Sequence, residues 1–404
     1  MLAYLPPLFF FAVLMGSPVP GFLVFMLLGG LHAWQSWRQP QAVRAFQWTK
    51  QDTLLALCFM SIPLFKALTV LWSEAPVLAW KNALQHSYFL FWPLVMAGLD
   101  KSKGVSRAQI DRAIAIGLIS LTLWRLIFQL TELSWLPPGN PNRGILAQLT
   151  MVLGAWNLLA LTHVNNRNSR GRCLYAAAAL CTFVLLINTE RRLELLGFVL
   201  LTVSILIWRW RTQMTLSRLV GLLLTTAIVL GIMVYLRWEL FAQGIDQLVR
   251  YLNTPAGERD LTNNSWGSRL EMWRLGWTAF LEHPILGLSA SIQPSQMQAW
   301  GAQPAETFGH RHFHGQWLQI LVEGGLLGAG IAVLTLAWII RSLIVRPMAK
   351  HEELSLLGAT LIGAYLIEGV ASAALHYDKP NAFMVVASAW LWAQLRNSPS
   401  AQAT

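Results

Sequence analysis

The sequence predicts an all-α, polytopic integral membrane protein with about twelve transmembrane helices and one large, partly helical loop. Composition is the first reason, because 55% of the 404 residues are hydrophobic and only 12% are charged. Soluble domains carry roughly twice that share of charge. The second reason is that apolar runs recur along the whole chain, and many of its twenty tryptophans stand at their ends. Tryptophan is enriched at membrane–water interfaces, so this placement is typical of a membrane protein.

About twelve apolar segments define the predicted helices, most of them near the ~20 residues that cross a bilayer. The first and the fourth are short. In chain order they are 4–16, 18–35, 53–72, 84–99, 111–131, 145–163, 173–188, 193–210, 217–236, 316–341, 354–375 and 380–395. Residues 1–236 then hold transmembrane helices one to nine, and residues 316–404 hold helices ten to twelve and a tail.

Basic residues occupy every second loop, and this alternation predicts the orientation. By the positive-inside rule these loops are cytoplasmic, and both termini and the tail lie on the same side. The net charge of +11 then reflects topology, so we expect no nucleic-acid partner despite a pI near 10. The basic loops lie around residues 38–50, 101–107, 167–172, 209–218 and 341–350.

The loop at 237–315 lies on the outer side, and its length of roughly 80 residues indicates structure or function of its own. Ser268 and Glu271 form a predicted capping box at the start of an amphipathic helix. His283 and Pro284 end that helix. Its apolar face could rest on the membrane or on the bundle of spans. That face contains Leu270, Trp273, Trp277 and Phe280.

Several charged side chains lie inside predicted spans, where a charge is costly without a partner or a function. Lys66 lies in the third span, Arg125 in the fifth and Glu368 in the eleventh. Lys66 taken alone is compatible with a side chain that extends to the interface. For Arg125 we predict a buried partner or a polar cavity.

Arg191 and Arg192 stand together in a very short outer loop, against the positive-inside bias. One interpretation is a salt-bridge cluster with Glu190 and Glu194. The other is a phosphate clamp, because the planar guanidinium fork matches phosphate geometry. Arg269 adds to the second interpretation, because it lies near the N-terminal end of the loop helix, where the helix dipole favours an anion.

Three histidines, His310, His312 and His314, alternate with Arg311 and Phe313 just before the tenth span. In an extended strand they would share one side and could bind a metal. No Asp, Glu or Cys close by completes such a site, and Arg311 would repel a cation, so we predict no metal. A general base is the better use of one imidazole, which titrates near neutrality.

This arrangement resembles the O-antigen ligase family, within the wider O-antigen ligase/polymerase superfamily of membrane glycosyltransferases. His314, followed after Gly315 by nine residues and then by Gly325 and Gly328, matches the signature that closes the family's large periplasmic loop. Gly315 departs from that signature, which has Asn, Ser or Gln there.

Two further elements carry the resemblance. Arg192 with Gly197 matches an arginine that opens a span in the family, and Arg191 remains a candidate for the same role. Arg269 with Trp273 matches an arginine–tryptophan pair in the large loop. The family-like segment His-Pro-Ile-Leu-Gly at 283–287 follows.

The resemblance implies a GT-C-like fold and a reaction without metal or cofactor. A glycan would pass from undecaprenyl diphosphate to a sugar hydroxyl of lipid A–core oligosaccharide, with inversion, at the periplasmic face of the bacterial inner membrane. His314 would be the general base, and Arg191, Arg192 and Arg269 would bind the diphosphate. The residues with expected supporting roles are His310, Arg311, His312, Arg125, Lys66 and His376.

Two classes of alternative stay open. An O-antigen polymerase or a protein O-oligosaccharyltransferase of the same superfamily shares the donor and differs in the acceptor. A lipid-linked-sugar flippase or other transporter would have an inverted repeat with broken helices near the membrane midplane. The sequence has no such repeat, and its unusual charges gather on the outer side, which favours an enzyme.

Overall fold

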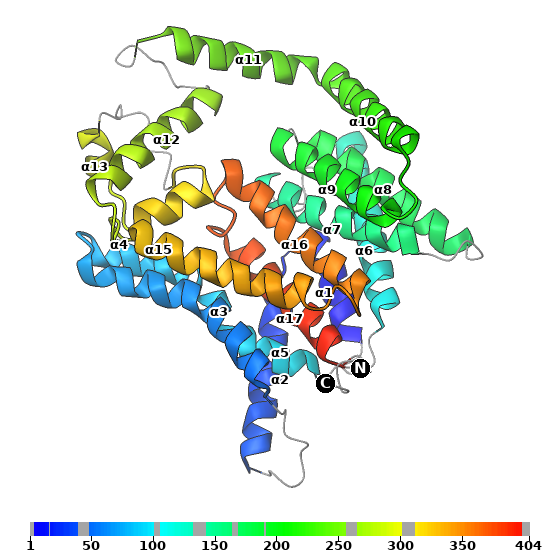
Figure 1. Cartoon of the computed structure of the whole chain (residues 1–404), viewed down its shortest axis with the longest axis horizontal. Coiled ribbons are helices and arrows are strands. Elements are labelled where there is room, and N and C mark those ends of the chain that lie inside the picture. The colour runs from blue at the N-terminus through cyan, green and yellow to red at the C-terminus, as the bar shows by residue number, and fades with distance from the viewer. Residues whose placement is uncertain are drawn as a thin grey trace.

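The computed structural model describes residues 4–15, 17–38, 48–100, 106–131, 143–163, 169–189, 191–255, 265–300 and 312–397. In these ranges every regular element is a helix, and the helices pack into one bundle (Figure 1). Eight of the described helices are long and apolar enough to cross a membrane. The prediction of an all-α, polytopic membrane protein is therefore confirmed at this level.

A helix stands at each of the predicted apolar segments. These are α1 (Leu5–Met15), α2 (Val19–Arg38), α3 (Lys50–Leu68) with η2 (Thr69–Trp72), η3 (Ser87–Phe91) with α5 (Trp92–Asp100), α6 (Arg107–Thr131), α7 (Arg143–His163), α8 (Ser169–Asn188), α9 (Arg192–Trp210), α10 (Leu216–Leu236), α15 (Gln316–Ile340) with η4 (Arg341–Val345), α16 (Glu352–Ala371) and α17 (Asp378–Asn397). The stretches Leu5–Leu14 and Ser87–Leu99 are apolar but shorter than a full span. The count of about twelve transmembrane helices stays a prediction.

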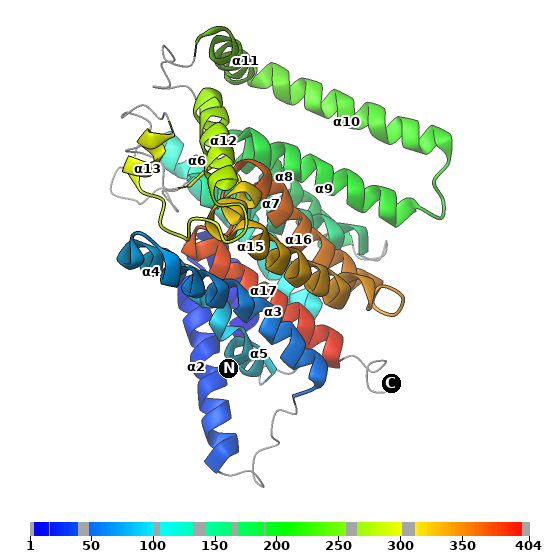
Figure 2. The ribbon, with the colours of Figure 1, turned by 60° about the vertical axis from the view of Figure 1, so that its left-hand side comes forward.

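The spans differ in how much of their surface other helices cover. Helix α7 lies in the centre, with 83% of its apolar window buried, whereas only 6% of the window of α10 is buried. Figure 2 shows α10 at the edge of the bundle. The aromatic side chains of Phe10, Trp156, Phe383 and Trp390 join α1, α7 and α17, with ring centroids 5.2–6.2 Å apart in the contacting pairs. Helix α10 therefore exposes its apolar surface to lipid rather than to protein.

Four shorter helices accompany the spans: α4 (Pro76–Leu84), α11 (Trp238–Asn253), α12 (Ser265–Glu282) and α13 (Pro294–Ala299). The sequence predicted only α12. The labelled ends of the chain lie near each other and away from α11, α12 and α13 (Figures 1 and 2). The loop helices thus gather at the end of the bundle opposite the termini.

One detail predicted for α12 is wrong. The helix begins at Ser265, so Ser268 already lies within its first turn and is not an N-cap. Of the predicted apolar face, Phe280 is buried, whereas Trp277 is 52% exposed. The buried residues Met272, Leu275 and Ala279 pack with Phe313 and Val322 of the segment that forms α15. Of the two predicted supports, α12 therefore rests on the helix bundle.

Candidate active site

Helix α15 is broken at Gly325, which has φ 58° and ψ −156°. In a continuous helix the Leu326 and Leu327 N–H groups would donate to the carbonyl oxygens of Val322 and Glu323. The break removes both bonds and leaves four backbone groups without helical partners. Unpaired backbone groups inside a membrane cost several kcal/mol each, so a broken span needs replacement partners.

Residues 284–289 supply all four partners. This segment follows α12 and crosses α15 at the break, where its backbone pairs with both halves of the helix. The bonds run from Leu326 N–H to the Pro284 carbonyl (2.8 Å), from Leu327 N–H to Ile285 (3.1 Å), from Leu288 N–H to Val322 (2.7 Å) and from Ser289 N–H to Glu323 (3.0 Å). The large loop is therefore joined to the interior of a span by backbone pairing.

Glycine is required on both sides of this junction. Gly325 adopts a conformation that is open essentially to glycine alone, and a Cβ there would also overlap the Ile285 carbonyl. Gly287 has φ 68°, and a Cβ on it would lie 2.6 Å from the Gly324 and Gly325 nitrogens. The glycines of the family-like segment at 283–287 and of the signature at Gly325 thus belong to one structural unit.

The first half of α15 holds the histidine segment in place. The Phe313 N–H donates to Gln319 Oε1 (2.9 Å), and Gln319 Nε2 donates to Glu323 Oε1 (2.7 Å). Glu323 Oε2 in turn pairs with Lys66 Nζ of α3 at 2.6 Å. Lys66 therefore makes a buried ion pair and does not extend to the membrane interface. A glutamate inside an apolar run was the signal that could have revealed this partner.

We expect Lys66→Met to lower the free energy of unfolding by about 3–5 kcal/mol, because it leaves the Glu323 carboxylate buried without its cation. The double variant Lys66→Met/Glu323→Gln should recover part of that loss. Thermal unfolding of the purified protein in detergent measures both. Lys81→Met, at an exposed position of α4, is the matched control and should change little. A double variant less stable than the single one would contradict the pairing.

His314 is held in a left-handed backbone conformation, with φ 50°. Its N–H donates to Nδ1 of His312 (3.2 Å), and its carbonyl accepts from Trp273 Nε1 of α12 (3.2 Å). Because Nδ1 of His312 accepts a hydrogen bond, the neutral ring carries its proton on Nε2. The side chains of His312 and Trp273 thus hold the backbone on both sides of His314.

The loop between α16 and α17 completes the histidine cluster. The His312 ring lies 4.2 Å from that of His314 and 5.1 Å from that of His376, measured between centroids. The Tyr377 hydroxyl lies 3.4 Å from His312 Nε2. Gln316 holds this loop by accepting a hydrogen bond from the Leu375 N–H (3.0 Å). The structure therefore places His376, predicted as a supporting residue, against His312, whose ring also contacts that of the predicted base.

The three predicted arginines also meet in one place. Arg191 caps the N-terminus of α9, Arg192 is its first residue, and Arg269 lies on α12. Burial lowers the pKa of the Arg269 guanidinium, and the positive charge of Arg191 lowers it further. Arg192 lies close enough to Arg269 for their positive charges to interact. Three guanidinium groups from two helix ends are therefore gathered in one region.

Two buried carboxylates accompany the arginines. Glu194 interacts electrostatically with Arg191 and Arg269, and so does Glu368 of α16. Glu194 is the partner foreseen in the salt-bridge interpretation, whereas Glu190 lies outside the described residues. The position of Glu194 is consistent with the salt-bridge interpretation of Arg191, and the phosphate clamp stays a prediction.

Tyr377 connects the two clusters. Burial raises the pKa of its hydroxyl, while Arg191 lowers that pKa and Glu368 raises it. The same hydroxyl reaches His312. The arginine cluster and the histidine cluster are therefore neighbours in space, although more than a hundred residues separate Arg191 from His314 in the chain.

Arg125, one of the predicted supporting residues, makes no contact with the histidine or arginine cluster among the described residues. Arg125 interacts with a like charge, Arg143, and its buried Nε has no hydrogen-bond partner among the residues that the structure describes. The buried partner predicted for it is not seen there. His310 and Arg311 lie outside the described residues. Within the described part of the chain, no group of three His, Cys, Asp or Glu side chains could hold a metal ion.

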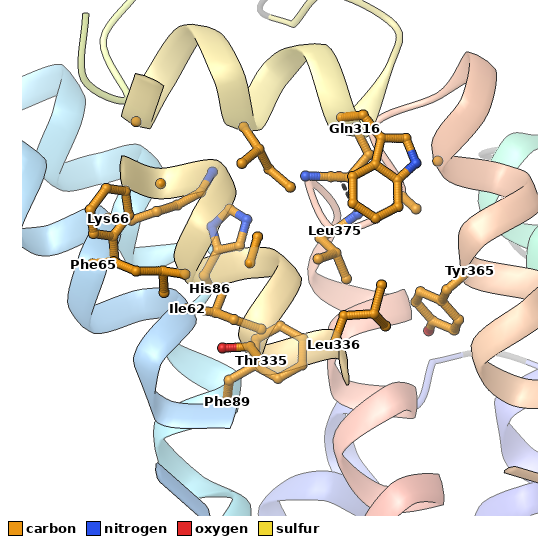
Figure 3. Close-up of a pocket in the computed structure, with 18 of the residues that line it drawn as sticks. Ile62, Phe65, Lys66, His86, Phe89, Gln316, Thr335, Leu336, Tyr365 and Leu375 are labelled. Atoms are coloured by element: carbon orange, nitrogen blue, oxygen red, sulfur yellow. Dashed lines mark hydrogen bonds between the residues drawn. The ribbon is translucent and has the colours of Figure 1, made fainter. Parts of the chain in front are cut away.

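A cavity of about 150 Å³ opens between α3, α15 and α16 next to this site. Figure 3 shows Lys66 and Gln316 at its upper end and Phe89 and Leu336 at its lower end. Lys66 and Gln316 thus stand near the histidine segment, whereas the walls farther along α15 are mostly apolar and include two polar side chains, Thr335 and Tyr365. This gradient matches a lipid, with its polar group at the site and its hydrocarbon chain along the helices.

A comparison with protein families supplies an independent finding. Residues 177–333 match the family model described as O-Antigen ligase. The match includes Arg191, Arg192, Arg269, His314 and the broken part of α15. A comparison with curated proteins found no match. The chain thus contains a segment similar to the O-antigen ligase family, within a helical architecture that includes eight candidate membrane spans in the described residues.

Proposed function

We propose that the protein is an O-antigen ligase, which transfers a glycan from undecaprenyl diphosphate to a sugar hydroxyl of lipid A–core oligosaccharide. The observation that carries the proposal is that the histidine cluster around His314 and the cluster of three arginines are neighbours, joined through Tyr377. One group can take a proton while the other receives negative charge, and a glycosyl transfer from a lipid diphosphate needs both. The site faces the periplasm of the inner membrane, as the predicted orientation requires.

The acceptor hydroxyl must lose a proton as it attacks the anomeric carbon of the donor sugar. Neutral His314 takes this proton, and the new glycosidic bond forms on the face opposite the leaving group, so the configuration inverts. His312 and Trp273 act on His314 through its backbone, and they keep the ring in its position between the two substrates. General-base catalysis of this kind contributes about 10²–10⁴-fold to a rate.

The bond that breaks joins the anomeric carbon to a phosphate oxygen, and the bonding electrons leave with undecaprenyl diphosphate. Arg191, Arg192 and Arg269 stabilise that charge as it grows, which is the usual source of a large electrostatic rate effect. A diphosphate needs no proton to leave, so the site requires no general acid. The apolar cavity beside α15 offers walls for a lipid hydrocarbon chain.

A broken span is also a feature of transporters. In this protein the break in α15 is occupied by the backbone of residues 284–289, which satisfies its polar groups. Charged residues gather around His314 at one end of the bundle. These two features favour an enzyme over a carrier.

The test is transfer by the purified protein from a lipid-diphosphate-linked glycan, with lipid A–core, a second donor molecule and a peptide offered as separate acceptors. We expect product only with lipid A–core, and equal product in the presence of EDTA. Transfer onto a second donor would identify a polymerase, and transfer onto the peptide would identify a protein glycosyltransferase. Loss of product in EDTA would contradict the metal-independent mechanism.

Replacing the arginines singly should weaken use of the diphosphate donor. We expect Arg191→Ala and Arg269→Ala to lower kcat/KM by about 10²-fold or more, because charge-assisted contacts to the leaving group are lost. Arg191→Lys should recover little, since an ammonium cannot bind phosphate bidentately. Arg237→Ala is the matched control, because that side chain caps carbonyls at the end of α8. Unchanged donor kinetics in all three arginine variants would exclude the clamp.

A further inference from the structure

Helix α11 carries an apolar face that no other described element covers. Trp238, Ile245, Val249 and Leu252 are between 47% and 66% exposed. With successive residues about 100° apart around a helix, these four lie within an arc of about 60°. An exposed apolar stripe of this kind, on an amphipathic helix that also carries charged residues, is the pattern of a helix that lies in a membrane interface.

The other faces of α11 have different surroundings. Glu239, Asp246 and Arg250 are exposed about a quarter turn away, and Arg250 pairs with Asp246 at 2.8 Å. A third face turns toward the bundle, where the Tyr251 hydroxyl donates to Glu271 Oε2 of α12 (2.9 Å). The charged face and the bundle face are thus both accounted for, and only the apolar face lacks a partner in the described structure.

The chain itself indicates what covers this face. Helix α10, a candidate span with almost all of its surface exposed, ends at Leu236, and α11 begins at Trp238. Figure 2 shows α10 along its length and α11 nearly end-on, so α11 runs across the axis of the span. A helix that starts where a span leaves the membrane, and runs across it, lies at the membrane surface.

We propose that α11 docks on the outer leaflet of the bilayer, with Trp238, Ile245, Val249 and Leu252 at the boundary between headgroups and acyl chains. The docking does not depend on the proposed function. It continues the lipid-exposed surface of α10 without interruption and leaves the Asp246–Arg250 pair in water. The partner is therefore a lipid surface, not a second protein.

The docking has a consequence for the arginine cluster, and this consequence rests on the proposed function. The Phe241 ring lies 5.8 Å from the Arg192 guanidinium carbon. Gly244 leaves room on the same face, where a Cβ would meet Arg192 and would lie 2.9 Å from Trp266 Nε1. By lying on the bilayer, α11 thus holds Arg192 at the depth of lipid phosphates.

Site-directed labelling of the full-length protein tests the docking. Cys58, Cys173 and Cys181 are replaced by serine, and an environment-sensitive fluorophore is attached through Ile245→Cys or Val249→Cys, or through the controls Gln243→Cys and Asp246→Cys. The labelled protein is reconstituted into vesicles of phosphatidylethanolamine and phosphatidylglycerol. We expect lipid-bound nitroxide to quench the first pair and aqueous iodide to quench the controls.

Iodide quenching that is equal at all four positions would overturn the docking. Shielding of positions 245 and 249 from both quenchers would also overturn it, and would indicate a second copy of the protein on this face. These outcomes need no enzymatic activity, so they stand even if the proposed function fails.

The link between membrane docking and the position of Arg192 is tested by donor binding. The double variant Ile245→Glu/Val249→Glu should raise the donor KM several-fold, whereas Gln243→Glu should not. An unchanged KM would overturn that link.

Discussion

His314→Asn should abolish glycan transfer while the protein still folds and inserts into the membrane. We expect kcat to fall by about 10²–10⁴-fold, because the base that takes the acceptor proton is lost. Asparagine is the informative replacement, since it tolerates the left-handed backbone conformation that His314 adopts. His314→Ala removes the base as well, but it also strains this backbone. Transfer to the acceptor in a reconstituted system, with expression and thermal stability measured alongside, checks the result.

His283→Ala is the control for this experiment. His283 belongs to the same loop and its side chain is exposed, so the loss of a histidine there should leave the rate unchanged. If His314→Asn formed capped lipopolysaccharide at the normal rate, the assignment of His314 as the base would be wrong. The arginine cluster would then have to act with a different proton acceptor.

Gly325→Ala should destabilise the protein by about 3 kcal/mol or more. The positive φ at this position costs ~1–3 kcal/mol for any other residue, and the new Cβ would overlap the Ile285 carbonyl. Moving residues 284–289 away would break up to four backbone hydrogen bonds, each worth ~1 kcal/mol. Activity should fall with stability, because the same half of α15 holds the histidine segment through Gln319.

Gly330→Ala tests the same substitution in the same helix, five residues farther on. A Cβ at Gly330 meets nothing within 4 Å, and alanine is favoured over glycine inside a helix by about 0.5–1 kcal/mol. We therefore expect Gly330→Ala to be neutral or slightly stabilising in thermal unfolding. Equal stability of the two variants would show that residues 284–289 do not depend on the glycine at the break.

Much of the candidate site could be predicted from local patterns. Two patterns are unusual wherever they stand in a chain: a histidine before an apolar run, and paired arginines in a short outer loop. A charged side chain near the membrane is costly unless it has a partner or a function. The carboxylates beside the arginines could not be predicted with the same ease. Glu194 and Glu368 belong to different spans, and the hydrophobic periodicity of each helix does not predict which residues of other helices contact these carboxylates.

The sequence by itself determined the all-helical architecture, the approximate positions of the long apolar helices and the candidate residues. The length of an apolar run sets whether a helix can cross a bilayer, and the basic loops predict which way it points. Both depend on neighbours in the chain, so both can be read without a structure.

Only the tertiary structure decided the pairings. It joined Lys66 to Glu323, excluded Arg125 from the site, turned the buried face of α12 onto α15, and placed residues 284–289 in the break at Gly325. Hydrophobic periodicity predicts which face of a helix is buried, but not which other helix packs against it. That pairing depends on complementary shape and charge between segments that are far apart in the chain. The histidine and the arginines become one site for that reason.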